Sequence, residues 1–347
     1  MTAATDAILY LAGDEVVAAC REIDAVAAMR EVLRLHAGGD ALLPAEAYLA
    51  WRTPSGAPAR SLNMPCALGA DLLRPGTKII NASLSNVERG LPRASGVVLL
   101  FDAETARVVC VMEAAHLSAT RTAGVTVVAA EELGVPPLRH VAVIGAGALG
   151  AAHAGLLADR LPGLERIEVF DVVAERAERL CAALAPAASG RGVALRATLS
   201  AKEAVDGAGL VVTATTVTSG YLEHGWLAPG ALVVNVSLDD LLPEVVLRAD
   251  HLIVDDWPLV RDDPYRLLGR LYREGAVVGP GEHAAPGSAR AVDATLGEVV
   301  SGGYRRERSP SDLVLVNPFG MAIEDIMLAH HVYEIARRRG LGQELPR

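Results

Sequence analysis

The pattern of hydrophobic and polar positions divides the chain into differently organised parts. Up to residue 133, helix-like and strand-like segments are separated by Pro-, Gly- and Arg-rich turns. Apolar residues spaced three and four apart predict one amphipathic helix over 15–37. Strands are predicted at 61–64, 77–81, 96–101 and 108–112, and a long helix over 113–133.

From residue 140 onward, short apolar strands alternate with helices. Strands are predicted at 140–144, 166–170, 210–214, 232–236 and 251–254, with helices at 148–160 and 173–185. This alternation is typical of a buried parallel sheet with right-handed crossovers. The segment 134–137 breaks the pattern, and 317–339 returns to a long helix. We therefore expect an α/β protein with one domain made of 1–125 and 317–347, and a second made of 126–316.

The most specific local motif is Val141-Ala142-Val143-Ile144-Gly145-Ala146-Gly147-Ala148-Leu149-Gly150. It follows an apolar strand and opens a helix, as a dinucleotide-binding turn requires. The first glycine permits the tight turn, the second lets a pyrophosphate approach the backbone, and the third lets helix and strand pack closely. Ala148 and Leu149 begin the helix, whose free N–H groups favour a phosphate.

Asp171 strengthens this interpretation because it ends the next predicted strand, about 20 residues further on, at the spacing of the ribose-binding carboxylate. A carboxylate there accepts from both ribose hydroxyls and repels a 2′-phosphate. The sequence therefore predicts a Rossmann-type domain that binds NAD in preference to NADP.

Composition excludes several other classes of protein. The 347 residues carry a net charge of −10, which argues against a nucleic-acid partner. No apolar run is long enough to span a membrane, and no signal peptide precedes the first helix. The four scattered cysteines and unpaired histidine spacings predict no metal site and fit free thiols in the cytoplasm.

Three polar residues are candidates for the chemistry. Only two of the 32 basic residues are lysines, and one of them, Lys78, lies on an apolar strand. Arg121 lies in a helix of small residues and suits a carboxylate ligand. Asp240 follows a predicted strand at its carboxyl end, where a general base is expected in a parallel sheet. A snorkelling lysine, an ordinary ion pair and a helix cap are the structural alternatives.

Together these segments resemble the ornithine cyclodeaminase/mu-crystallin family from about residue 8 to 335. The resemblance rests on six motifs in order, namely the Lys78 strand, Gly90-Leu91-Pro92, Arg121-Thr122-Ala123, Val143-Ile144-Gly145-Ala146-Gly147, the 235–240 loop and Gly320-Met321-Ala322-Ile323-Glu324-Asp325. It implies an NAD-dependent enzyme that acts on a small amino-acid-derived substrate. It also implies a homodimer, joined through a domain that binds the substrate.

The resemblance assigns roles to individual residues. Lys78 and Arg121 would bind the substrate α-carboxylate, with Lys78 also polarising the reacting bond. Asp240 would be the catalytic acid/base. The residues that would contact NAD, besides the glycine turn, are Thr122, Asp171, Thr215 and Ser237. The Glu324-Asp325 pair could act as acid/base groups or could instead cap the helix or form ion pairs.

Within the family, the chain departs from ornithine cyclodeaminase and looks like the N-(2-amino-2-carboxyethyl)-L-glutamate dehydrogenases. The shared segments are Arg60-Ser61-Leu62-Asn63-Met64-Pro65, Arg93-Ala94-Ser95-Gly96, Met112-Glu113-Ala114, Val254-Asp255-Asp256-Trp257 and the region 317–325. That substrate has three carboxylates, so Arg60 and Arg93 are expected to supply additional cations. An ornithine or lysine cyclodeaminase, an imine reductase and a non-catalytic binder are the alternatives.

Overall fold

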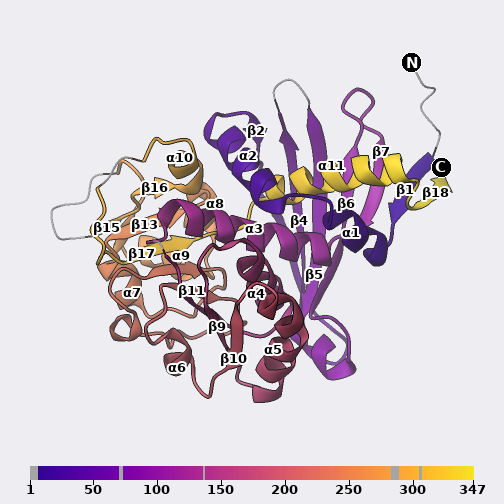
Figure 1. Ribbon diagram of the computed structural model, residues 1–347. Coiled ribbons are helices and arrows are strands. Elements are labelled where there is room, and N and C mark those ends of the chain that lie inside the picture. Colours follow the sequence, from indigo (N-terminus) through magenta and orange to yellow (C-terminus); the bar gives the residue numbers. More distant parts are fainter. Residues whose placement is uncertain (1–6, 70–72, 136, 283–288, 305–306) are drawn as a thin grey trace. The chain divides into compact units, whose positions relative to one another are not determined.

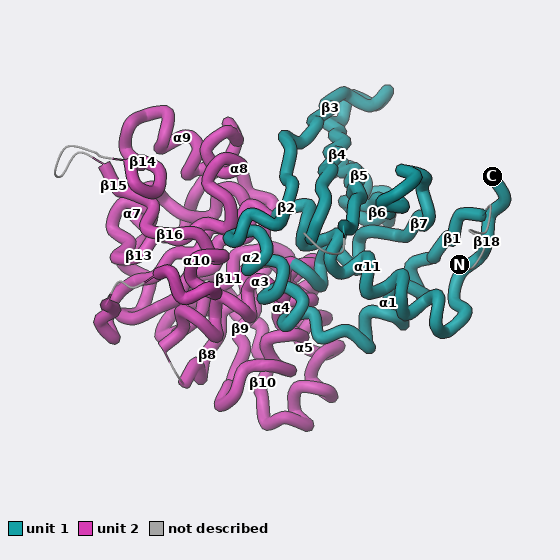
Figure 2. The backbone as a smooth tube through the Cα atoms, turned by 90° about the horizontal axis from the view of Figure 1, so that it is seen from above, with its two compact units in different colours: residues 1–121, 321–347 teal, residues 122–320 magenta. Residues whose placement is uncertain are grey.

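The computed structural model describes residues 7–69, 73–135, 137–282, 289–304 and 307–347. The chain forms two compact units, one of Met1–Arg121 with Met321–Arg347 and one of Thr122–Gly320 (Figure 2). Residues 122–125 and 317–320, which we expected in the first domain, group with the second unit. The chain passes from one unit to the other within helix α3 (Ala115–Leu133).

The first unit is built on a mixed sheet with the strand order β18-β1-β7-β6-β5-β4-β2, and β3 pairs with β4. Neighbouring strands are antiparallel except for β1 and β7. The strands are β1 (Ala7–Leu11), β2 (Ala41–Leu42), β3 (Ala47–Arg52), β4 (Pro58–Leu68), β5 (Arg74–Ser83), β6 (Ala94–Phe101), β7 (Val108–Glu113) and β18 (Gln343–Pro346).

Helix α11 (Ala322–Arg339) packs on β4, β5 and β6 and crosses one face of this sheet (Figure 1). Gly76 makes the close approach possible, because a Cβ there would lie 2.6 Å from Ile326 Cδ1. The single helix predicted over 15–37 is wrong. Two helices, α1 (Gly13–Cys20) and α2 (Ala25–Ala37), replace it, since Asp24 caps α2 by accepting from the N–H groups of Val26 and Ala27.

The second unit is a parallel sheet with the strand order β10-β9-β8-β11-β12-β17-β13-β16. Its strands are β8 (His140–Ile144), β9 (Arg166–Phe170), β10 (Ala194–Ala197), β11 (Leu210–Thr213), β12 (Leu232–Asn235), β13 (His251–Val254), β16 (Ala294–Thr295) and β17 (Val314–Asn317). The sequence analysis missed β17, which lies between β12 and β13, and the C-terminal helix begins at Ala322 and not at 317.

The remaining elements of the second unit flank this sheet or join its strands. The helices are α4 (Ala148–Arg160), α5 (Ala174–Ser189), α6 (Ala201–Val205), α7 (Pro243–Arg248), α8 (Trp257–Asp262), α9 (Leu267–Arg273) and α10 (Leu296–Val300), and a small second sheet pairs β14 (Val277–Val278) with β15 (Arg290–Ala291). The described residues also form two 3₁₀ helices, η1 (Leu84–Arg89) in the first unit and η2 (His224–Trp226) in the second.

Strand order in the second unit reverses between β8 and β11, which is the switch point of a Rossmann-type fold. The predicted α/β class is therefore confirmed. Ligands of such sheets bind at the carboxyl ends of the strands, so the loops after β8, β9, β11, β12 and β17 form the edge of interest. None of the described helices is both long and apolar enough to cross a membrane.

Candidate active site

The turn between β8 and α4 has the geometry that the glycine motif predicts. Gly145 has a φ of +104°, and a Cβ there would lie 2.6 Å from the carbonyl oxygen of Ala214. A Cβ on Gly150 would lie 1.8 Å from the carbonyl oxygen of Gly145. A Cβ on Gly147 would meet nothing within 4 Å. The first and third glycines are thus required by the turn itself, whereas the second leaves open space where a pyrophosphate can approach.

Asp171 lies beside this turn. Its Oδ2 accepts from the Ala146 N–H at 2.8 Å and its Oδ1 from the Val173 N–H at 2.9 Å. A pocket of about 340 Å³ opens against the turn and the start of α4, and its lining includes Gly147, Ala148 and Arg176. Turn, carboxylate and pocket together fit the pyrophosphate and ribose of a dinucleotide.

Asp240 is completely buried in the loop after β12. Its Oδ1 accepts from the Tyr221 hydroxyl at 2.7 Å and from the Thr215 hydroxyl at 2.8 Å. Burial raises the pKa of this carboxyl group above its usual value, while the hydrogen bonds from Tyr221 and Thr215 oppose the rise. The Ser237 hydroxyl donates to Thr213 Oγ1, and no described residue donates a hydrogen bond to Asp240 Oδ2.

A carboxyl group with a raised pKa holds a proton more readily than an ordinary aspartate, as a residue that takes up and returns a proton must. The preceding residue, Asp239, has different contacts, because Arg270 donates to both of its oxygens, at 2.7 and 3.3 Å. Of the two neighbouring carboxylates, only Asp240 has an oxygen without a hydrogen-bond partner in the described part of the chain.

The first unit holds a buried cluster of four charges. Lys78 Nζ lies 2.5 Å from Asp325 Oδ2, and Arg121 reaches Glu324 at 2.7 Å and Asp325 at 3.2 Å. Ser118 lies 3.3 Å from Lys78 Nζ and 3.5 Å from Arg121 Nη2. The structure therefore favours ion pairing for Glu324 and Asp325.

Burial sets the protonation of this cluster together with the neighbouring charges. It lowers the pKa of Lys78, although Asp325 opposes the shift. Burial alone would raise the pKa of Asp325, but the charges of Arg121 and Lys78 outweigh it and hold that pKa below its usual value. A lysine has three N–H donors and an arginine five. The described partners take two donors of Lys78 and three of Arg121, so both cations keep donors for a ligand.

Arg60 and Arg93 form a second cationic group in the first unit. Arg60 lies opposite Ala82 on β5, and Met64 lies opposite Lys78. Because side chains alternate along a strand, Arg60 and Lys78 point to the same face of the sheet. Burial lowers the pKa of Arg93, and the nearby charge of Arg60 lowers it further. Neither guanidinium has a carboxylate partner among the residues that the structure describes.

Thr122 and Thr215, which were predicted to contact NAD, have hydrogen-bond partners within the protein. Thr122 is buried in α3, and its carbonyl accepts from the Thr126 hydroxyl. The Thr215 hydroxyl, expected on the cofactor, donates to Asp240. Sequence analysis missed Tyr221, because its loop carries no motif and lies 19 residues before Asp240. It also missed Ser118, which lies on the same helix as Arg121 and could have been found from that spacing.

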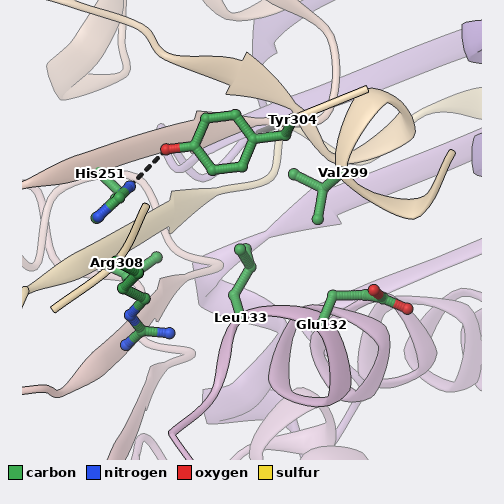
Figure 3. Close-up of a pocket in the computed structure, with 7 residues that line it drawn as sticks. Glu132, Leu133, His251, Val299, Tyr304 and Arg308 are labelled. Atoms are coloured by element: carbon green, nitrogen blue, oxygen red, sulfur yellow. Dashed lines mark hydrogen bonds between the residues drawn. The ribbon is translucent and has the colours of Figure 1, made fainter. Parts of the chain in front are cut away.

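A separate pocket of about 220 Å³ contains none of the predicted residues (Figure 3). His251 Nδ1 faces the Tyr304 hydroxyl there, and its Nε2 lies 3.0 Å from Asp312 Oδ2. These contacts tie the segment after α10 to β13, and we assign them a structural role. In the described part of the chain, no three His, Cys, Asp or Glu side chains gather as metal ligands.

Comparison with known proteins agrees with this arrangement. The model of the ornithine cyclodeaminase/mu-crystallin family matches residues 14–340. The chain belongs to this family. An N-((2S)-2-amino-2-carboxyethyl)-L-glutamate dehydrogenase of Staphylococcus aureus is 33% identical to this family member, over 92% of each chain. The crystal structure of CmnK is 39% identical and covers 98% of both chains with a TM-score of 0.88. A Δ(1)-pyrroline-2-carboxylate reductase of Paracoccus denitrificans is 26% identical over 75% of this chain and 79% of its own.

Two glycine substitutions test the dinucleotide site of this family member. Gly147→Ala should leave the melting temperature nearly unchanged but weaken NADH binding, since its Cβ enters only open space. Gly150→Ala should lower both stability and NADH binding, because its Cβ overlaps the Gly145 carbonyl. Thermal unfolding and NADH fluorescence titration measure the two effects. Unchanged NADH affinity in Gly147→Ala would place the cofactor elsewhere.

The buried charges predict a strong coupling between Lys78 and Asp325. Lys78→Met should lower the free energy of unfolding by about 3–5 kcal/mol, because it removes a cation from buried Asp325. The double variant Lys78→Met/Asp325→Leu leaves Arg121 paired with Glu324 and should recover most of that loss. Urea titration measures both. A single variant as stable as the unaltered chain would show that Lys78 does not stabilise the fold.

Proposed function

We propose that this chain is an NAD-dependent dehydrogenase that cleaves N-(2-amino-2-carboxyethyl)-L-glutamate to L-2,3-diaminopropionate and 2-oxoglutarate. The product would serve siderophore or nonribosomal peptide biosynthesis. The observation that carries the proposal is the Arg60–Arg93 pair, which lacks a carboxylate partner among the described residues and lies at the sheet that bears Lys78. Two neighbouring guanidinium groups that no described carboxylate pairs with suit additional substrate carboxylates. The named activity of the Staphylococcus aureus relative supports the same substrate.

The proposed reaction divides the work among named side chains. NAD, held at the glycine turn and by Asp171, would supply the hydride acceptor for the glutamate Cα. Lys78 and Arg121 bind the carboxylate beside that carbon through the N–H donors that their own partners leave. Asp240 takes a proton from the water that adds to the resulting C=N carbon, and it returns the proton to the departing amine. Breaking the C–N bond, with loss of the remaining hydroxyl proton to solvent, then releases the keto acid and the diamino acid.

The cofactor assignment rests on this chain's own residues. Gly145, Gly147 and Gly150 shape the turn, and Ala148 and Leu149 provide the first N–H groups of α4. Asp171 already accepts hydrogen bonds beside the turn, so its carboxylate is positioned for ribose hydroxyls and disfavours a 2′-phosphate. We therefore propose NAD as the cofactor. We extend the site to Thr122, Thr215 and Ser237, and we propose a cytoplasmic location, which the free, buried cysteines suit.

We also propose that the enzyme is a homodimer joined through the first unit. On the sheet face away from Lys78, the side chains of Leu49 and Trp51 are 62% and 44% exposed. Val97 and Leu99 on β6 are partly exposed on the same face. An apolar sheet face of this kind suits a protein partner. Sedimentation of the intact chain distinguishes a dimer from a monomer.

The second candidate function is an imine reductase, in which NADH gives hydride to a C=N bond. The Δ(1)-pyrroline-2-carboxylate reductase of Paracoccus denitrificans supports this candidate. The same acid/base residue and cofactor site would serve that reaction. The substrate would then carry a single carboxylate, which leaves Arg60 and Arg93 without a function. A cyclodeaminase meets the same objection.

The substrate assignment is tested by following NADH at 340 nm. N-(2-amino-2-carboxyethyl)-L-glutamate, the tricarboxylate substrate, should reduce NAD and yield diaminopropionate and 2-oxoglutarate, which mass spectrometry identifies. Ornithine, lysine and cyclic imines should react far more slowly. Arg60→Gln/Arg93→Gln should raise the KM for the tricarboxylate at least tenfold. Turnover of ornithine to proline, or a double variant with an unchanged KM, would contradict the assignment.

Asp240→Asn should reduce turnover by about 10²–10⁴-fold while NADH still binds. The raised pKa also predicts the effect on stability. Because this buried carboxyl group ionises less readily in the folded state than in the unfolded state, the free energy of unfolding falls as pH rises above the pKa of the unfolded chain. Asp240→Asn should thus be more stable than the unaltered chain at pH 7, and the difference should vanish as pH falls below about 4. Asp239→Asn is the matched control and should keep most of the turnover.

A further inference from the structure

Asn317 ends β17, at the edge of the parallel sheet where ligands bind, and its side chain is only 2% exposed. A buried amide normally has partners for both its oxygen and its nitrogen. Asn317 has a partner on one side only. Its Oδ1 accepts from Asn235 Nδ2 at 2.8 Å, whereas no described residue accepts a hydrogen bond from its Nδ2.

The orientation of the two amides follows from their neighbours. Asn235 Nδ2 lies 3.2 Å from the carbonyl oxygen of Ser237, which can only accept a hydrogen bond. The Asn235 atom at that position must therefore be the nitrogen. Its oxygen on the other side accepts from the Thr213 hydroxyl at 2.7 Å. Because Asn235 donates to Asn317, the Asn317 atom that faces it must be the oxygen, and the NH₂ group points away from this network.

The position of Asn317 narrows what can satisfy this NH₂ group. The glycine turn and Asp171 follow β8 and β9, in the half of the sheet that takes the adenosine side of a dinucleotide. The loops after β11, β12 and β17 belong to the other half, and Asp240 lies in one of them. Asn317 thus lies on the side of the sheet that takes the nicotinamide and the reacting substrate.

We propose that Asn317 Nδ2 donates a hydrogen bond to a carbonyl-type oxygen of a bound ligand. That oxygen belongs either to the carboxamide of the nicotinamide ring or to a substrate carboxylate, since both present the same acceptor. A hydrogen bond to the carboxamide would fix which face of the ring meets the substrate. A hydrogen bond to the carboxylate would instead orient the substrate. Asn317 is therefore a ligand-positioning residue, and this assignment rests on the proposed binding of NAD.

Two variants remove the donor in different ways. Asn317→Leu keeps the volume but removes both polar atoms. Asn317→Asp keeps an oxygen for Asn235 and replaces the NH₂ group by a second acceptor. Thr213→Val is the matched control, because it disturbs Asn235 from its other side and leaves the Asn317 NH₂ group in place. Circular dichroism and thermal unfolding confirm that each variant is folded.

The experiment compares the binding of NADH with that of ADP-ribose, which lacks the nicotinamide ring, and adds the KM for the tricarboxylate. A carboxamide contact predicts NADH binding weakened about two- to tenfold in both Asn317 variants, with ADP-ribose and the control unchanged. A carboxylate contact predicts unchanged binding of both nucleotides and a KM raised by a similar factor.

Variants that bind NADH and substrate like the unaltered chain would overturn the inference, as would equal weakening of NADH and ADP-ribose. An effect of Thr213→Val as large as that of Asn317→Leu would also overturn it, because the network as a whole would then be responsible. If the unaltered chain binds no NADH at all, the proposed function fails and this inference fails with it.

Discussion

Burial of Lys78 and Arg121 constrains the whole first unit. Two cations out of contact with water require nearby anions, and Glu324 and Asp325 provide them from a helix 247 residues beyond Lys78. The place of α11 on the sheet is therefore set by charge pairing as well as by the apolar contact that Gly76 permits. The charges of Lys78 and Arg121 are cancelled by those of Glu324 and Asp325. We therefore assign the attraction of the additional substrate carboxylates to Arg60 and Arg93.

The second unit depends on a different constraint, the common direction of its strands. Parallel strands bring their carboxyl ends to one edge, so residues from Gly145 to Asn317 meet there although they are far apart in sequence. The same edge combines groups with opposite requirements. Gly147 needs empty space, whereas Asp240 needs burial to keep its pKa high against the hydrogen-bond donors that lower it.

Sequence reasoning succeeded where the signal was local. The glycine turn and the strands β8, β9, β11, β12 and β13 follow from short patterns, and their types were predicted correctly, whereas β10 was missed. It failed for β17, whose three apolar residues before Asn317 show no alternation, and for the α1–α2 break, where capping by Asp24 outweighs a continuous apolar stripe. The partners of Asp240 come from another loop and that of Asn317 from another strand, so no spacing rule reveals them. The substrate was inferred from resemblance, because the Arg60–Arg93 pair exists only once β4, β5 and β6 align.

The division of the chain has a consequence for synthesis on the ribosome. The second unit is continuous, so all of its strands are available once Gly320 has emerged. The first unit is interrupted, and Lys78 and Arg121 must wait for α11 before their counter-ions exist. A nascent chain that has emerged only to residue 320 therefore carries one unit ready to fold and another whose central cations must stay hydrated. Vectorial synthesis thus imposes an order of assembly in which the second unit precedes the first.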